Sequence, residues 1–392
     1  MRKLILNPFF YYILTFAIAF LLYQLGWSDL YPDLSGNILN FVVITLILSV
    51  PCLLIFSNIC SRCFKNLSNH KLILNVSKRN IYGICIFMIF MMLIEFVYNK
   101  GVPLFFIVKG VEYKYTLFGI PVLHVFILPF IAVLGFTFFY RYIIFGEKKY
   151  LLPVFLSFLF PILIFNRAIA IFMLLGCLFI YLFYTYSFSK IIKGVLILVV
   201  ALYIFGLAGN MRMKSSGFVE DNAVLNIGKA SYKFENSIVP NEFFWGYLYL
   251  SSPLANMQNE INTFNPQNDG FVSFVVYEVF PDFISKRINP MISGVDQANL
   301  IDENLNVSTM YGGAIHKLNI LGAYLLYFYY ILFVFFFTIF CSGHMRAVML
   351  TVLSTISVLL IFTNLLTSSG FFFQVLFILL FSRLRVKGFS II

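Results

Sequence analysis

Long apolar runs separated by short polar segments dominate the chain and define its predicted elements. Ten runs approach the ~20 residues with which a helix crosses ~30 Å of hydrocarbon. They cover residues 4–26, 38–59, 81–98, 119–140, 151–165, 168–188, 191–209, 319–341, 347–366 and 370–382. The fifth and tenth runs are short, and the fifth and sixth also fit a re-entrant pair around Asn166, which would put Arg167 at membrane depth.

The pattern predicts an all-α polytopic membrane protein with about ten transmembrane helices. Residues 1–209 would hold the first seven helices, residues 210–318 one large loop, and residues 319–392 the last three helices. Composition agrees, because 61% of the residues are hydrophobic and 11% charged, whereas soluble domains are roughly 45–50% apolar and about 25% charged.

The charge distribution predicts how the chain is oriented in the membrane. Lys and Arg outnumber Asp and Glu by 27 to 16, which gives a net charge of +11. Most of the cationic residues in short segments lie on one side of the ten predicted spans, and such residues stay preferentially in the cytoplasm. We therefore expect cytoplasmic N- and C-termini and a periplasmic 210–318 loop, and the charge gives no reason to expect nucleic acid as a partner.

The long loop carries most of the polar chemistry. It contains no Walker lysine loop, glycine-rich nucleotide fingerprint, H-E-x-x-H, D-x-D or G-x-S-x-G pattern, so we predict no cofactor, no metal site and no serine nucleophile. An enzyme at this face would need a substrate already activated by its carrier. Long loops of this size are usually functional when they are ordered.

Cations at the two ends and the middle of the loop are the candidate site residues. Guanidinium groups hold phosphate oxygens through paired donors, and an imidazole suits general-base catalysis on a hydroxyl. If the eighth span is helical before Lys317, then His316 and Asn319 share a face while Lys317 points ~100° away. The candidates are Arg212 and His316 as catalytic residues, and Lys214, Arg287, Arg167, Asn210, Glu95 and Asn319 as substrate-binding residues.

Several of these positions also have a purely structural interpretation. Lys317 would then anchor its helix at the interface, and His124 would be a buried hydrogen-bonded residue and not a base. Glu95 is costly in lipid unless it is paired, which predicts an outer-face cation as its partner. The aromatic patches at residues 243–250 and 271–277 fit either the headgroup zone or a packing core of the loop, and the loop's prolines predict short helices.

Five local patterns in order along the chain resemble the Wzy-type O-antigen (oligosaccharide repeat unit) polymerases. The resemblance covers most of the chain, on ten predicted spans with one large loop. The patterns are Leu25-Gly26-Trp27-Ser28-Asp29-Leu30-Tyr31-Pro32, Gly101-Val102-Pro103-Leu104 leading to Tyr115-Thr116-Leu117-Phe118-Gly119-Ile120-Pro121, Gly209-Asn210-Met211-Arg212, Tyr249-Leu250-Ser251-Ser252-Pro253-Leu254-Ala255-Asn256 and Ser308-Thr309-Met310-Tyr311-Gly312-Gly313.

The resemblance implies a GT-C-like glycosyltransferase of the Gram-negative inner membrane that works without metal or nucleotide. Such an enzyme joins oligosaccharides linked to undecaprenyl diphosphate, with membrane lipid and possible chain-length regulator proteins as further partners. Arg212 best matches the family's diphosphate-binding arginines and Arg287 matches more loosely. His316 followed by Gly322 approximates the family's histidine pattern at a shorter spacing.

Two other functions stay open at this point. An O-antigen ligase, which transfers glycan to lipid A core, would share the chemistry and the late loop. A flippase or transporter of lipid-linked oligosaccharide would belong to a different class, but such proteins keep functional charges within their spans.

Overall fold

The computed structural model describes residues 2–65, 76–109, 118–215, 223–266, 269–288, 299–343, 345–383, 385–386 and 389–390. Helices account for most of these residues. A two-residue strand β1 (Arg385–Val386) pairs antiparallel with β2 (Phe389–Ser390) near the C-terminus. The architecture is therefore all-helical in essence, as predicted.

The first half of the chain folds into a succession of apolar helices. Asn7 begins the first of them, because its side-chain oxygen accepts hydrogen bonds from the Phe9 and Phe10 amides. The helices are η1 (Arg2–Leu4), α1 (Pro8–Tyr23), α2 (Gly36–Lys65), α4 (Lys78–Tyr98), α5 (Pro103–Val108), α6 (His124–Phe145), η3 (Lys148–Tyr150), α7 (Leu151–Leu163), α8 (Arg167–Tyr184) and α9 (Phe188–Ser215).

The predicted loop and the last part of the chain are also helical. Within the loop the helices are α10 (Ala223–Ile227), α11 (Tyr232–Glu235), α12 (Phe243–Asn262), α13 (Gly270–Phe274), the π-helical turn η4 (Val275–Val279) and α14 (Asp282–Ile288). After the loop come α15 (Gly312–Phe340), α16 (Arg346–Leu359) and α17 (Ser369–Arg383).

Six helices in the described part of the chain are long and apolar enough to cross a membrane: α2, α4, α6, α8, α9 and α15. Shorter apolar helices, among them α1, α16 and α17, cover other predicted spans. Only 6% of the apolar window of α9 is buried by the rest of the protein, and Ile197 on it is 69% exposed. Such a surface is stable only in lipid, so these features are those of a polytopic membrane protein.

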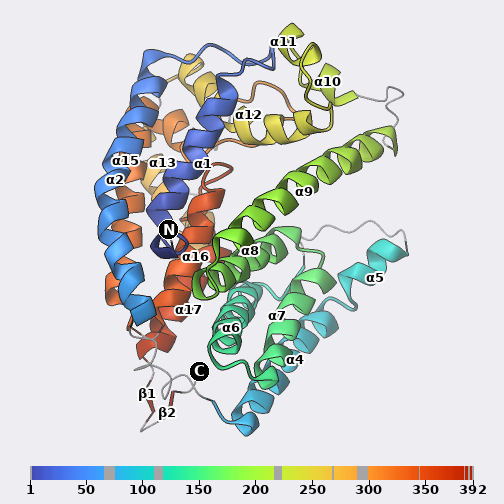
Figure 1. Cartoon of the computed structure of the whole chain (residues 1–392), viewed down its shortest axis with the longest axis vertical. Helices are drawn as coiled ribbons and strands as arrows, with labels where there is room; N and C mark the ends of the chain where they lie inside the picture. The colour runs from blue at the N-terminus through green and yellow to red at the C-terminus, as the bar shows by residue number, and fades with distance from the viewer. Residues whose placement is uncertain are drawn as a thin grey trace.

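The helices pack into two adjoining groups (Figure 1). Helices α1, α2, α15, α16 and α17 form one group, while α4, α6, α7 and α8 form the other. Contacts of α17 with α6 and of α16 with α8 join the two groups. Helices α10, α11 and α12 lie together at one end of the molecule, and β1 and β2 lie at the opposite end.

The first aromatic patch, residues 243–250, forms the beginning of α12 and packs a small core of its own. Phe244 and Tyr247 are buried there against Phe234 and Trp27. Burial raises the pKa of the Tyr247 hydroxyl to about 12, so the hydroxyl stays protonated and accepts a hydrogen bond from the Trp27 amide at 3.2 Å. The patch thus serves as a packing core for the loop.

Helix α12 is longer than the loop's prolines predicted. It runs for 20 residues with Pro253 inside it. Proline removes one backbone hydrogen bond and strains the preceding turn, but Leu254 and Met257 on the same helix are fully buried in the main core. Tertiary packing therefore outweighs the local cost of the proline.

Several predicted spans begin or end elsewhere in the structure, those of α6 and α16 among them. Helix α6 begins at His124 and not at residue 119, because Gly119 and Val122 have positive φ values and Pro121 lies between them. Helix α16 ends at Leu359, and the apolar residues after it leave the helix to bond with the loop, as shown by the Met310 amide donating to the Leu360 carbonyl at 2.8 Å.

Candidate functional site

Helix α12 presents a buried polar face to the segment that leads into α15. Asn256 is fully buried. Its Nδ2 donates to the Leu305 and Val307 carbonyls at 2.6 and 2.8 Å, and its Oδ1 accepts from the Ile301 amide at 2.9 Å. A buried amide without partners would be costly. These bonds therefore fix the irregular segment that positions His316.

Glu260, one turn further along α12, pairs with His316. Its Oε2 lies 2.9 Å from His316 Nδ1, and its Oε1 accepts a hydrogen bond from the Asn299 amide at 2.7 Å. The carboxylate is 1% exposed and the imidazole 14%. With Nδ1–H donating to the carboxylate, Nε2 is the nitrogen that can take up a proton. The carboxylate therefore fixes the tautomer and the orientation of the imidazole.

Lys317 pairs with a different carboxylate, that of Glu278 in η4. Lys317 Nζ lies 2.9 Å from Glu278 Oε1 and donates to the Gly313 carbonyl at 3.1 Å. Asn364 Nδ2 donates to both the backbone and the side chain of Glu278, at 3.0 and 3.2 Å. Gly313 leaves no room for a Cβ against Glu278 Oε1. Lys317 is thus held in a largely buried ion pair.

A break in α15 follows these two side chains. Leu318 and Asn319 have non-helical backbone angles, and Asn319 has a φ of 53°. Asn319 Oδ1 accepts a hydrogen bond from the Ile320 amide at 2.7 Å, which helps the helix to begin again. Close approach of Gly322 to the Ala314 carbonyl accompanies the break. Strained backbone of this kind clusters at functional sites.

The break changes how the predicted residues relate to one another. His316 and Asn319 would share a face only on a continuous helix, and the break separates them. His316 and Lys317 face different partners, Glu260 on α12 and Glu278 on η4. The short segment before the break therefore directs two neighbouring polar side chains to separate elements.

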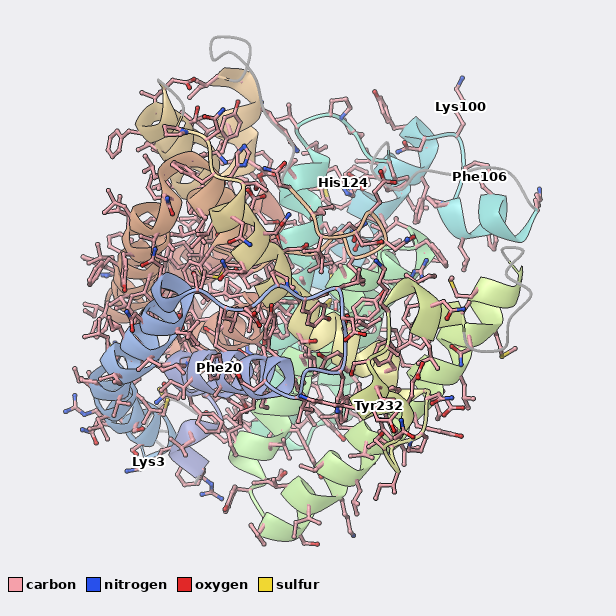
Figure 2. All side chains as sticks on the ribbon, turned by 90° about the horizontal axis from the view of Figure 1, so that it is seen from above. Lys3, Phe20, Lys100, Phe106, His124 and Tyr232 are labelled. Carbon is pink, nitrogen blue, oxygen red and sulfur yellow. The ribbon has the colours of Figure 1, made fainter. Side chains whose placement is uncertain are left out.

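A second histidine pairs with a carboxylate at the beginning of α6. His124 Nδ1 lies 2.8 Å from Oε2 of Glu95, whose side chain is fully buried. Asn99 links the same two elements, because it donates to the Glu95 carbonyl at 2.7 Å and accepts from the Gly119 amide at 3.3 Å. Seen from above, Lys100 points outward whereas His124 lies among the helices (Figure 2). The partner of Glu95 is thus this imidazole and not a lysine or arginine.

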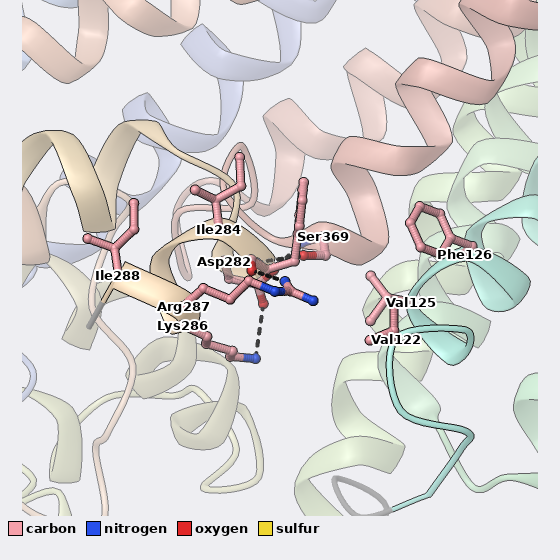
Figure 3. A pocket seen from close by; sticks show the side chains of 10 residues that line it. Val122, Val125, Phe126, Asp282, Ile284, Lys286, Arg287, Ile288 and Ser369 are labelled. Carbon is pink, nitrogen blue, oxygen red and sulfur yellow. Dashed lines mark hydrogen bonds and ion pairs between the residues drawn. The ribbon is translucent and has the colours of Figure 1, made fainter. Parts of the chain in front are cut away.

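A cavity of about 620 Å³ lies between α6, α14 and the beginning of α17 (Figure 3). Its apolar lining comes from α14 and from residues at the beginning of α6, and its polar lining comes from α14 and α17. The lining residues are Val122, Val125, Phe126, Asp282, Phe283, Ile284, Lys286, Arg287, Ile288 and Ser369. Val122 and Val125 flank His124 in the chain, so the Glu95–His124 pair supports one wall of the cavity.

Two cations extend from α14 toward the gap between α14 and α6 (Figure 3). Lys286 Nζ lies 3.4 Å from Asp282 Oδ2, and Arg287 donates to the Phe283 carbonyl. Asp282 in turn accepts hydrogen bonds from the amide and hydroxyl of Ser369, at the first residue of α17. Lys286 and Arg287 are exposed, so both keep donors for an anion at a cavity whose other lining residues are apolar except Asp282 and Ser369.

The cavity and the broken helix are connected through the segment between α16 and α17. Asn364 in that segment binds Glu278, and the Thr367 carbonyl accepts from the Asp282 amide at 2.7 Å. Glu278 and Asp282 stand at the two ends of one short stretch of chain. The segment between α16 and α17 therefore contacts both Glu278, which pairs with Lys317, and α14, which carries the two cations.

The other predicted site residues lie apart from this assembly or outside the described part. Asn210 on α9 accepts a hydrogen bond from Trp245 Nε1 at 2.8 Å. The backbone of Arg212 and Lys214 belongs to α9, but their side chains lie outside the described residues. Nothing in the structure therefore relates these two cations to the cavity.

Arg167 is the first residue of α8, and its side chain is exposed. Its guanidinium lies 4.9 Å from the Phe165 ring centroid. Asn166 caps the helix by accepting from the Ile169 amide at 3.2 Å. The pair Asn166 and Arg167 thus forms a capped turn between α7 and α8.

Glu260 and Glu278, the two carboxylates that hold His316 and Lys317, were not among the residues predicted from the sequence. A signal for Glu260 does exist, since Ser252, Asn256 and Glu260 recur every four residues and so mark one helical face. No comparable period marks Glu278, because the π-helical turn changes the spacing. Among the described residues, no three or more His, Cys, Asp or Glu side chains group to hold a metal ion.

Comparison of the chain with known proteins gives no match. No family model matches the sequence, and neither a curated protein nor a solved structure is significantly similar to it.

Proposed function

We propose that the chain is a membrane glycosyltransferase that polymerises oligosaccharide repeat units carried on undecaprenyl diphosphate at the periplasmic face of the inner membrane. The growing chain is transferred from its carrier to the next lipid-linked unit. The observation that carries this proposal is the apolar cavity between α6 and α14, with Lys286 and Arg287 at its polar side.

The cavity supports the proposal because it combines the two properties that a lipid-linked diphosphate requires. Its wall of valine, isoleucine and phenylalanine side chains suits an isoprenoid chain. The ammonium of Lys286 and the guanidinium of Arg287 suit a diphosphate, whose negative charge grows as the glycosidic bond to it breaks. The beginnings of α6 and α17 add the positive ends of two helix dipoles.

In the proposed reaction, a sugar hydroxyl of the acceptor unit attacks the anomeric carbon of the growing chain. A bond forms between that oxygen and that carbon, and the bond from the carbon to the diphosphate oxygen breaks. The hydroxyl proton goes to His316 Nε2, while Glu260 stabilises the resulting imidazolium. Undecaprenyl diphosphate leaves, with its charge held by Lys286 and Arg287.

Deleting the gene in its host separates this function from the two alternatives. A polymerase deletion leaves lipopolysaccharide with a single repeat unit on the core, which a gel resolves. Complete loss of O antigen from the core would instead indicate a ligase or a flippase, and an unchanged ladder would exclude all three.

Complementation of the deletion strain then tests the cavity. We expect the double variant Lys286→Ala/Arg287→Ala to shorten the ladder strongly, because each lost charged hydrogen bond is worth about 1.5–3 kcal/mol. Lys233→Ala on α11 removes an exposed lysine outside the cavity and is the matched control. A full-length ladder with both cations removed, at normal protein level, would overturn the assignment of the cavity.

A further inference from the structure

A second concave site lies between α12 and the segment that follows residue 303. It is a small groove of about 50 Å³. Its lining residues are Trp245, Leu248, Tyr249 and Ser252 on one side, and Asn304, Leu305, Asn306 and Val307 on the other. The groove shares no lining residue with the cationic cavity.

Two aromatic rings form the α12 side of the groove. Trp245 and Tyr249 lie one helical turn apart with ring centroids 6.4 Å apart and an interplanar angle of 35°. Helix α9 holds the Trp245 ring in place. Trp245 Nε1 donates to Asn210 Oδ1 at 2.8 Å, and Gly209 lies against the ring with no room for a Cβ. Tyr249 remains 43% exposed. The rings therefore form a rigid and partly open surface.

The opposite side of the groove consists of irregular chain with two exposed amides. Asn304 and Asn306 are exposed, and the Asn304 amide group also donates to Asp302 Oδ1 at 2.9 Å. The backbone beside them is held by the buried Asn256, which binds the carbonyls of Leu305 and Val307. The buried Asn256 side chain thus fixes the exposed segment that carries Asn304 and Asn306 opposite the two aromatic rings.

The chemistry of the groove differs from that of the cavity in its charge. None of the groove's lining residues is ionisable at neutral pH, whereas the cavity has an aspartate, a lysine and an arginine. Aromatic faces pack against the C–H faces of a sugar ring, and amide groups both donate to and accept from its hydroxyls. A neutral glycan satisfies both sides of the groove, whereas an anionic headgroup would find no lysine or arginine among the lining residues.

We propose that this groove binds the glycan, with sugar rings on Trp245 and Tyr249 and their hydroxyls bonded to Asn304 and Asn306. This inference rests on the proposed function, because that function makes an O-antigen repeat unit the ligand. The groove holds the sugar part of the substrate while the cavity holds the carrier, so glycan recognition and diphosphate recognition use separate residues.

Tryptophan fluorescence tests the groove directly, because Trp27 and Trp245 are the two tryptophans of the chain. The full-length protein with Trp27→Phe reports on Trp245 alone. The probe is O-polysaccharide released from the host's own lipopolysaccharide by mild acid. We expect saturable change in Trp245 emission with the polysaccharide, and none with dextran of equal mass.

Three variants decide whether the groove is the binding site. Tyr249→Ala and Asn304→Ala/Asn306→Ala should each weaken polysaccharide binding by about tenfold, the cost of one lost stacking or paired polar contact. Tyr232→Ala on α11, which removes a tyrosine that is 79% exposed and outside the groove, should leave binding unchanged. Equal binding by all variants would overturn the proposal, as would a Trp245 response to phosphatidylglycerol vesicles in place of the polysaccharide.

A second measurement covers the event that Trp27→Phe does not fold, since Trp27 packs on Phe234 and Tyr247. Wild-type protein labelled with 5-fluorotryptophan gives one fluorine resonance for each tryptophan, and only that of Trp245 should shift with polysaccharide. Shift of neither resonance would overturn the groove while leaving the ladder test of Lys286 and Arg287 intact. An unchanged ladder after gene deletion would instead remove the proposed function, whatever the groove binds.

Discussion

The pairs Glu95–His124 and Glu260–His316 place the same contact in two different surroundings. In each, a nearly inaccessible carboxylate lies within 3 Å of a histidine Nδ1, at 2.8 and 2.9 Å. Both oxygens of Glu95 face His124. Glu260 instead divides its oxygens between His316 and the Asn299 amide. The Glu95 carboxylate thus directs both oxygens to one partner, whereas the Glu260 carboxylate bridges two.

The supports of the two pairs differ as well. Glu95–His124 joins α4 to the beginning of α6 behind an apolar wall of the cavity. Glu260–His316 lies just before the break in α15, beside the Lys317–Glu278 ion pair. In the function that we propose, two similar histidine–carboxylate contacts would have different roles, one positioning a wall of the cavity and the other orienting a base. The surroundings, and not the contact, distinguish them.

The sharpest test of this distinction is His316→Gln. Glutamine can still donate to Glu260 but cannot take up a proton near neutral pH, so the fold is kept and the base is lost. We expect polymer formation to fall by about 100-fold or more, the usual worth of general-base catalysis. Ladder length and protein level in the complemented deletion strain measure this, and a normal ladder would remove His316 as the base.

Glu260→Gln should give a smaller loss. The amide removes the charge that stabilises the imidazolium and no longer selects the tautomer. The imidazole itself remains, so we expect the loss to stay below the roughly 10²–10⁴-fold that general-base catalysis contributes. Rescue of the ladder by Glu260→Asp, at a reduced level, would support orientation by a carboxylate. Activity of Glu260→Gln equal to wild type would show that the pair is purely structural.

His124→Gln should have the smallest effect on polymer formation, within a fewfold of wild type, because the pair positions a wall and transfers no proton. Its effect should appear in thermal unfolding of the purified protein, since removing one partner of a buried pair destabilises a fold by about 3–5 kcal/mol and a donor-retaining amide by less. A loss of polymer as large as that of His316→Gln would reverse the assignment of the two pairs.

The sequence predicted the helical class and the positions of its apolar helices, because lipid exposure imposes long apolar runs that need no tertiary information. Each of the ten predicted ranges contains a helix. Their ends were predicted less well where other contacts compete, as at the non-helical turn before His124 and the apolar segment after Leu359. The number of crossings and the GT-C-like arrangement stay predictions.

The candidate site was only partly predictable, for a physical reason. His316 and Arg287 stood out by their chemistry as titratable residues of the long loop, and Glu95 because a carboxylate near lipid is costly unless it is paired. Their partners come from elements that are distant in sequence, as Glu260 is 56 residues from His316. Such pairings depend on how α12 packs against α15, and no local pattern records this packing.

Turnover by the purified protein in liposomes, supplied only with lipid-linked repeat units isolated from the deletion strain, tests the proposed polymerase most directly. We predict oligosaccharides of two or more units, with one undecaprenyl diphosphate released for each new bond, and their loss in Lys286→Ala/Arg287→Ala but not in Lys233→Ala. Liposomes that contain folded protein and still yield only single units would contradict the proposal.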